Sequence, residues 1–128
     1  MIVADTDVLI DYLQGKGETA DRVALEIDHA QLHTTAITRF ELLAGARSAR
    51  QERLVAHLLA ALPCLPLDVP AADRAAEVRR TLEKGGWPIG MGDSLIAGIV
   101  LVNRGVLLTR NRRHFERVPG LALSGVWK

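Results

Sequence analysis

Short apolar runs alternate along this chain with longer segments in which apolar residues recur at helical spacing. The short runs are rich in aliphatic and β-branched residues and predict strands. We expect these strands at residues 1–4, 31–36, 64–67, 106–109 and 121–127. The longer segments predict helices at residues 8–13, 18–30, 38–47, 49–62, 70–84 and 93–103. Strands that alternate with helices favour an α/β fold, in which a mainly parallel sheet has helices on both faces.

Two of the expected helices have distinctive apolar patterns. Residues 93–103 are apolar nearly all round, which indicates a central, buried helix. Residues 49–62 instead place Leu58, Leu59 and other apolar side chains on one face opposite charged ones. That face is expected either to cover the protein's own core or to bind a partner.

Three carboxylates stand near expected helix starts. Asp5 opens an Asp-Thr-Asp turn after the first strand, Glu41 completes a capping box with Thr38, and Asp93 is placed to cap the last long helix. Taken singly, each is explained by local structure. A parallel sheet, however, would bring all three acids to one edge, where their repulsion calls for a cation. Oxygen ligands select a hard ion, Mg²⁺ or Mn²⁺, over zinc.

Composition and charge narrow the class of protein. At 128 residues, 48% of them hydrophobic, the chain is expected to form one globular domain over residues 1–128. Cys64 is the only cysteine, which excludes a disulfide framework and favours a reducing, cytoplasmic setting. The apolar run at 95–102 is too short to cross a bilayer, and we expect neither membrane insertion nor secretion.

Acids gather early in the chain and bases late. Residues 1–93 hold 10 Lys or Arg and 14 Asp or Glu, whereas residues 94–128 hold 6 Lys or Arg and a single acid, Glu116. A fold that joins the two regions would set a carboxylate cluster beside a basic flank, as expected for a metal site that acts on a polyanion.

Four motifs stand in order along the chain: VADTDVLID at residues 3–11, TRFELLAG at 38–45, GDSLIA at 92–97 and LTRNRRHF at 108–115. Together they resemble the PIN-domain family, and more narrowly the VapC toxins of bacterial toxin–antitoxin pairs. The resemblance implies a three-layer PIN-like fold and an endoribonuclease that depends on Mg²⁺, with Mn²⁺ able to substitute. It also implies that Asp5, Glu41 and Asp93 are the catalytic, metal-binding acids. The implied partners are an RNA substrate, a cognate VapB-like antitoxin and a second copy of the chain. If the antitoxin bound the face of residues 49–62, charging Leu58 and Leu59 would release it without unfolding the protein.

One position departs from the family pattern. Many PIN domains have a fourth acid after the strand that ends at Thr109, and Asn111 stands in that slot, with His114 further along. A neutral amide is a weaker ligand than a carboxylate, so we expect one tightly held ion and a second recruited by the substrate phosphate. Asn111 and Thr109 are then expected to orient water or a ligand. None of the four histidines shows metal-ligand spacing.

Supporting and substrate-binding roles are expected for several further residues. Asp7 and Ser94 are interpreted either as supports of a ligating carboxylate or as local caps. The basic side chains of Arg110, Arg112 and Arg113 are candidates for contacts with RNA phosphates, although such runs are often only a solvated surface. Trp87 either stacks on a base or anchors its glycine-rich loop.

Two other functions compete with the nuclease. The sequence Asp5-Thr6-Asp7 resembles the Asp-x-Asp of haloacid-dehalogenase-like phosphatases, but Lys16 and Lys84 are poorly placed for that chemistry and Glu41 and Asp93 would have no role. The second alternative is a non-catalytic PIN-fold module that binds RNA or protein. Metal binding measured by calorimetry would separate that module from an enzyme.

Overall fold

The computed structural model describes residues 1–125, and these form one parallel five-stranded sheet. In chain order its strands are β1 (Ile2–Ala4), β2 (Leu32–Thr35), β3 (Cys64–Leu65), β4 (Val106–Thr109) and β5 (Ala122–Gly125). They lie side by side in the order β3-β2-β1-β4-β5, and each pair of neighbours is parallel. Strand β3, which is flanked by prolines, lies at an edge of the sheet. The sequence predicts this position, because a proline has no backbone N–H to donate to a neighbouring strand. The expected strand at 121–127 is confirmed up to Gly125, and its last two positions lie outside the described residues.

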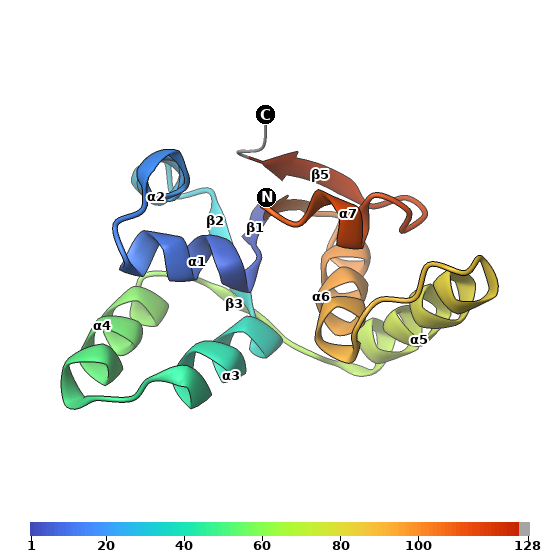
Figure 1. Ribbon diagram of the computed structural model, residues 1–128, viewed down its shortest axis with the longest axis horizontal. Helices are drawn as coiled ribbons and strands as arrows, with labels where there is room; N and C mark the ends of the chain where they lie inside the picture. Colours follow the sequence, from blue (N-terminus) through green and yellow to red (C-terminus); the bar gives the residue numbers. More distant parts are fainter. Residues whose placement is uncertain (126–128) are drawn as a thin grey trace.

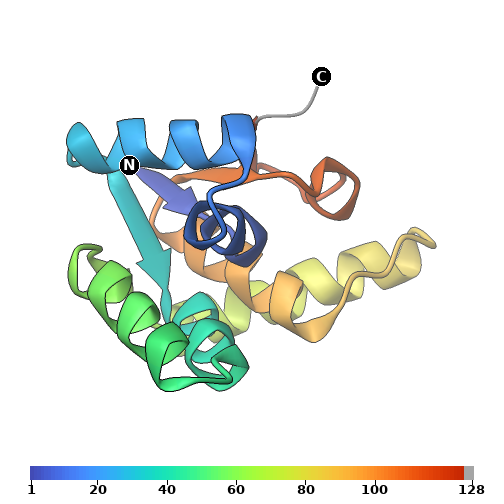
Figure 2. The ribbon, with the colours of Figure 1, turned by 60° about the vertical axis from the view of Figure 1, so that its left-hand side comes forward.

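Seven helices connect the strands within the described residues. They are α1 (Thr6–Leu13), α2 (Gly17–Asp28), α3 (Ala36–Gly45), α4 (Ala49–Ala60), α5 (Val69–Lys84), α6 (Met91–Val102) and α7 (Arg112–Phe115). Figure 1 shows α1, α2 and α4 on one side of the sheet and α5 and α6 on the other. Helices α5 and α6 lie against each other in both views (Figures 1 and 2). This three-layer arrangement confirms the α/β fold expected from the sequence.

Alternation along β1 and β4 divides the core into two halves. Val3 and Leu107 belong to one buried cluster with α5 and α6, whereas Ala4 and Leu108 belong to the other with α1, α2 and α4. All four are at most 1% exposed. Since successive strand residues point to opposite faces, such an alternation is expected only where both faces of a sheet are covered.

The order of the strands fixes where a ligand site belongs. From β1 the chain first builds outward through β2 and β3, and it then crosses to the other side of β1 to add β4 and β5. The sheet therefore grows from β1 in opposite directions, first through β2 and later through β4. In open parallel sheets the crevice at such a switch point, beyond the carboxyl ends of the strands, is the usual binding site. Here that place lies just after Ala4 in β1 and Thr109 in β4.

Two predicted helix starts are wrong. Helix α3 begins at Ala36 with Thr35 as its N-cap, whose hydroxyl accepts a hydrogen bond from the Thr38 amide. Thr38 is therefore inside the helix and forms no capping box with Glu41. Helix α6 begins at Met91 with Gly90 as its N-cap, so Asp93 lies in the first turn rather than at the cap.

The Asp-Thr-Asp segment is also different from the expected turn. Asp5 is itself the N-cap of α1, and Thr6 and Asp7 form the first turn of that helix. Helix α7 was not predicted, because four residues are too few to show a helical period.

The apolar face of α4 is core. Val55, Leu58 and Leu59 are 4–5% exposed and pack in the cluster with α1 and α2. The prediction that charges at Leu58 and Leu59 would leave the fold intact is therefore wrong, since either charge would be buried without a partner. Within residues 1–125, no helix is both long and apolar enough to cross a membrane.

Candidate active site

Asp5 lies at the centre of the switch point and is held from two elements. Its Oδ1 accepts a hydrogen bond from the Thr6 amide at 2.8 Å, and its Oδ2 accepts one from the Thr109 hydroxyl at 2.8 Å. The first contact caps α1, and the second joins the ends of β1 and β4 across 104 residues of chain. The carboxylate is therefore fixed in orientation before any ligand binds.

The environment of Asp5 disfavours its negative charge. The residue is only 3% exposed, and the pKa of its carboxyl is raised from 3.8 to about 6, chiefly by burial. The negative charges of Asp93 and Asp7 contribute to this rise, while the hydrogen bonds from Thr109 and Thr6 oppose it. An acid with a strongly shifted pKa in a crevice is a candidate functional group. A bound cation would offset the negative charge that burial and the two neighbouring acids disfavour.

Glu41 reaches the same crevice from α3. The Thr6 hydroxyl donates to Glu41 Oε1 at 2.7 Å, and the Thr38 hydroxyl lies 3.0 Å from the Thr6 hydroxyl. Because the single Thr6 proton goes to Glu41, Thr38 donates to Thr6. The other oxygen, Oε2, lies beside Gly92, where an added Cβ would meet it at 3.8 Å. Glu41 is thus tied to the first turn of α1 on one side and borders the first turn of α6 on the other.

Asp93 enters from the first turn of α6 and is held by a histidine. His114 Nδ1 lies 2.8 Å from Asp93 Oδ2, which fixes one carboxylate oxygen to α7. This partner was missed in the sequence, where no histidine was given a role. The Ser94 hydroxyl donates to the Gly90 carbonyl at 2.9 Å, a local hydrogen bond at the start of α6.

A second chain of hydrogen bonds supports the site from the loop after β4. The Asn111 amide donates to the Thr109 hydroxyl at 2.9 Å, and the Asn111 side chain donates to Asp7 Oδ2. Thr109 in turn donates to Asp5. Asn111 therefore binds a neighbouring acid, and it fixes the hydroxyl that orients Asp5.

The acids that the sequence singled out come together, but not as a closed cage. Asp5 and Asp93 interact electrostatically, and Glu41 lies beside Gly92 next to Asp93. No three His, Cys, Asp or Glu residues among residues 1–125 lie close enough to form a complete metal-ligand group. The donor set still fits a hard divalent cation, because Mg²⁺ keeps several waters and is usually held by only one or two carboxylates together with substrate phosphates.

The basic residues differ in how freely they can meet a substrate. Arg110 is bound to the buried Asp11 through Nε–Oδ2 at 2.7 Å, although 45% of its side chain stays exposed. Arg112 pairs with Glu116 at 3.4 Å on the surface of α7, and Arg113 is exposed beside it. Arg110 therefore also fastens the loop after β4 to α1, whereas the two α7 arginines lie on the surface.

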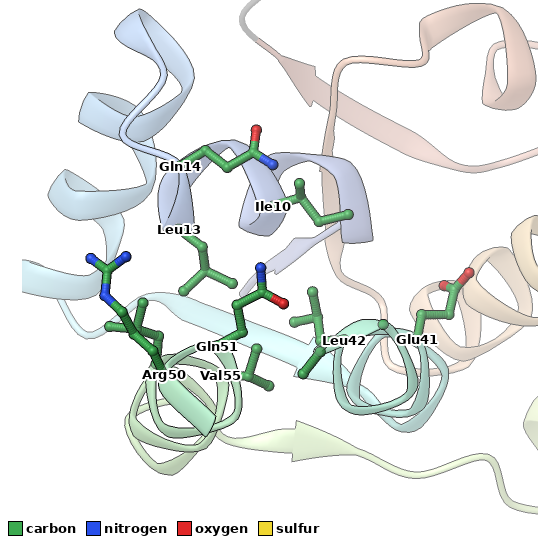
Figure 3. A pocket seen from close by; sticks show the side chains of 11 residues that line it. Ile10, Leu13, Gln14, Glu41, Leu42, Arg50, Gln51 and Val55 are labelled. Atoms are coloured by element: carbon green, nitrogen blue, oxygen red, sulfur yellow. The ribbon is translucent and has the colours of Figure 1, made fainter. Parts of the chain in front are cut away.

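A groove runs beside the acids between α1, α3 and α4. It has a volume of about 550 Å³ and is lined by Ile10, Leu13, Gln14, Glu41, Leu42, Gly45, Ala46, Arg50, Gln51, Leu54 and Val55. Figure 3 shows Glu41 at one end of this groove and Arg50 at the other, with aliphatic side chains between them. The groove thus joins an apolar floor to one acid of the candidate site.

Comparison with known proteins places the chain among small nucleases. The family model "PIN domain" matches residues 2–121. The tRNA(fMet)-specific endonuclease VapC of Salmonella typhimurium is 32% identical over 124 residues, which cover 94% of this chain and 93% of that protein. Ribonuclease VapC10 of Mycobacterium tuberculosis is 34% identical over 129 residues, which cover 98% and 96%.

Solved structures agree with this placement. A chain from the DNA-bound VapBC of Salmonella typhimurium is 31% identical, with a TM-score of 0.84 and coverage of 97% of this chain and 96% of that one. A chain from VapBC2 of Rickettsia felis has a TM-score of 0.87 over the full length of both chains, and at 23% identity it shows the fold alone. The PIN-domain match over residues 2–121 argues against the dehalogenase-like phosphatase.

Proposed function

Because this chain belongs to the PIN-domain family, we propose that it is a divalent-metal-dependent endoribonuclease and the toxin of a VapBC-type toxin–antitoxin pair. The observation that carries the proposal is the buried Asp5, fixed by Thr6 and Thr109, with the charges of Asp93 and Asp7 close enough to raise its pKa further. Such a site favours the binding of a cation. The relatives at 32–34% identity are named as ribonucleases or endonucleases, and this supports RNA as the substrate.

We assign the metal to Asp5 and Asp93, with Glu41 bordering it. The preferred ion is Mg²⁺, with Mn²⁺ able to substitute, since Asp5 and Asp93 both offer carboxylate oxygens. When bound, the cation supplies positive charge that polarises the scissile phosphate and activates a water molecule. Hydrogen bonds from Thr6 and Thr109 keep the Asp5 oxygens oriented, and His114 does the same for Asp93.

Glu41 is the residue that accepts the proton of the attacking water. One of its oxygens is occupied by the Thr6 hydroxyl, and the other borders the crevice at Gly92. The water oxygen forms a bond to phosphorus, the bond from phosphorus to the leaving ribose oxygen breaks, and that oxygen takes a proton from solvent. Arg112 and Arg113, with the exposed part of Arg110, hold the flanking phosphates. No covalent intermediate on the protein is needed.

The groove between α1, α3 and α4 is our site for the antitoxin. Its aliphatic floor suits an apolar helix face, and Glu41 at its end suits a basic side chain of the same partner (Figure 3). An antitoxin bound in this way would neutralise the proton acceptor and block the crevice. The proposal also includes a homodimer and a reducing, cytoplasmic setting, in keeping with the single, unpaired Cys64.

Cleavage of end-labelled RNA is the test. Total RNA and tRNA(fMet), the substrate in the name of the Salmonella relative, are incubated with the protein and Mg²⁺, Mn²⁺ or EDTA. Discrete products are expected only with a cation, and Asp93→Asn and Glu41→Gln are each expected to slow cleavage by about 100-fold or more. Asp73→Asn, which removes an exposed acid of α5, is the matched control and should cleave normally. Undiminished cleavage by Asp93→Asn would refute the site, and metal binding without any cleavage would support the non-catalytic module.

A further inference from the structure

Trp87 is a large aromatic residue that stays exposed to solvent in the fold. It is 55% exposed, and the guanidinium carbon of Arg117 lies 3.5 Å from the centroid of its ring. One face of the indole is therefore covered by a flat cation, and much of the remaining ring surface is in solvent. The pair presents an aromatic ring with a guanidinium group over one of its faces, and both are groups on which nucleobases stack.

The backbone at Trp87 is rigidly held. Helix α5 ends in a motif in which Gly86, at φ +80°, turns the chain back, and the Trp87 amide donates to the Leu82 carbonyl at 2.8 Å. Pro88 follows and restricts the next peptide. The backbone that carries the indole is thus ordered before any ligand arrives, which lowers the entropy lost on binding.

Burial of core surface does not account for the indole. In this type of helix end, a residue at the Trp87 position commonly covers the side chain three residues from the helix terminus, here Leu82. Leu82 is already 4% exposed, within the cluster of α5 and α6, and over half of the Trp87 surface still remains in solvent. A smaller apolar residue would also cover Leu82 and would leave less apolar surface exposed to water.

The segment that contains α7 links the Trp87–Arg117 pair with the candidate active site. Arg117 lies over the ring of Trp87, and His114, three residues earlier, binds Asp93. Helix α7 ends at Phe115, and Arg117 stands in the turn that follows it. The same segment therefore connects the exposed aromatic pair with an acid of the crevice, and it carries the arginines assigned to phosphates, Arg112 and Arg113.

We propose that Trp87 and Arg117 form a stacking platform for an unpaired nucleobase of the RNA, next to the phosphates held by α7. This inference rests on the proposed function and specifies its substrate as RNA that is single-stranded at the platform. A base within a duplex is stacked on both faces and is not available to the indole, so single strands and loops are preferred over duplexes.

Paired RNA probes test the platform directly. The protein carrying Glu41→Gln, which blocks cleavage, is titrated with a fluorescein-labelled 12-nucleotide oligouridylate and with an abasic ribose-phosphate strand of equal length. Trp87→Leu, which keeps apolar bulk but removes the ring, is expected to weaken binding of the oligouridylate by about 10-fold and binding of the abasic strand by less than 2-fold. Trp87→Phe, which keeps an aromatic face, should restore most of the affinity.

Two arginine variants complete the design. Arg117→Lys keeps the charge but loses the plane, and it should weaken only the oligouridylate. Arg113→Ala, the control for phosphate contacts, should weaken both strands equally. Equal effects of Trp87→Leu on the two strands, or no effect on either, would overturn the platform even if the wild-type protein cleaves RNA. Absence of both cleavage and oligouridylate binding in the wild-type protein would overturn the proposed function as well.

Discussion

The unfavourable charge of Asp5 has a measurable consequence at the level of one residue. Its pKa is 3.8 in an exposed chain and about 6 in the fold, so the folded state binds the proton more tightly than the unfolded state. Protonation therefore favours folding. Without bound metal, the free energy of unfolding should fall as the pH rises from about 4 to about 6, and the penalty should be complete above that range.

Asp5→Asn removes this penalty. A shift of about two pKa units corresponds to a gain of about 3 kcal/mol in the free energy of unfolding. About 1 kcal/mol of this is lost, because the single amide oxygen of asparagine cannot accept hydrogen bonds from both Thr6 and Thr109. Urea unfolding in EDTA should show the variant to be more stable than the wild-type protein at pH 7.5 and no more stable at pH 4. Asp21→Asn, at an exposed site on α2, should show no such difference between pH 7.5 and pH 4. If Asp5→Asn were less stable than the wild-type protein at both pH values, the charge of Asp5 would not destabilise the fold.

His114 should act on metal binding through Asp93. Removing the imidazole frees the carboxylate oxygen Oδ2 from α7, and loss of such a supporting contact typically weakens metal binding by about 10-fold or more. Calorimetric titration with Mn²⁺ should show this loss in His114→Ala and partial recovery in His114→Asn, which retains a donor. The exposed His57 on α4 provides the control, His57→Ala. Equal Mn²⁺ affinity in the wild-type protein and His114→Ala would remove His114 from the site.

The sequence singled out the acids and gave Thr109 and Asn111 supporting roles, but it did not predict the partner of Asp93. Asp5 follows the end of a strand and Asp93 stands near a helix start, whereas the capping box that drew attention to Glu41 does not form. The contact of His114 with Asp93 joins residues 21 positions apart and depends on how α7 packs against α6, which no local pattern records. The bond between Arg110 and Asp11 is hidden for the same reason. Whether the named residues bind metal and RNA stays a prediction.

At the level of elements, α5 and α6 approach each other closely at Gly98. A Cβ at Gly98 would meet the Ala71 carbonyl oxygen at 2.6 Å and the Ala75 backbone and side chain at 2.7 Å, and none of these contacts is a flexible chain end. Only glycine fits there. The position of α6, and with it that of Asp93 in its first turn, therefore depends on this small residue.

Gly98→Ala should force the two helices apart. Overpacking of this kind costs about 1–3 kcal/mol, and the displacement of α6 should lower RNA cleavage together with the melting temperature. Gly45→Ala is the matched control, because nothing lies within 4 Å of its added Cβ and its φ is not positive. Thermal unfolding of both variants checks the comparison. A Gly98→Ala protein as stable as the Gly45→Ala protein would show that the contact can relax.

Helix starts were the weakest part of the sequence prediction, and the reason is physical. Three threonines, Thr34, Thr35 and Thr38, precede or enter α3, and each can cap a helix, so the choice depends on where β2 ends in the sheet. The start of α6 was obscured by Gly90 and Gly92, whose low helix propensity suggested a loop. Interiors of long helices were predicted well because their periodicity spans several turns.

At the scale of the whole molecule, the layer order followed from the alternation of strands and helices. The expected parallel sheet is confirmed, and it has the acids at the carboxyl ends of its strands. The sequence did not reveal that β4 lies next to β1, because strand neighbours far apart in the chain leave no local trace. The family resemblance supplied what the pattern lacked, and the match over residues 2–121 confirms it.

The bond between Asp5 and Thr109 also orders events during synthesis. Asp5 is made 104 residues before the hydroxyl that orients it, and β1 has only one sheet neighbour until β4 emerges. A nascent or prematurely terminated chain therefore has no assembled crevice. The cell that makes this protein is exposed to its nuclease only when translation has nearly reached the last strand.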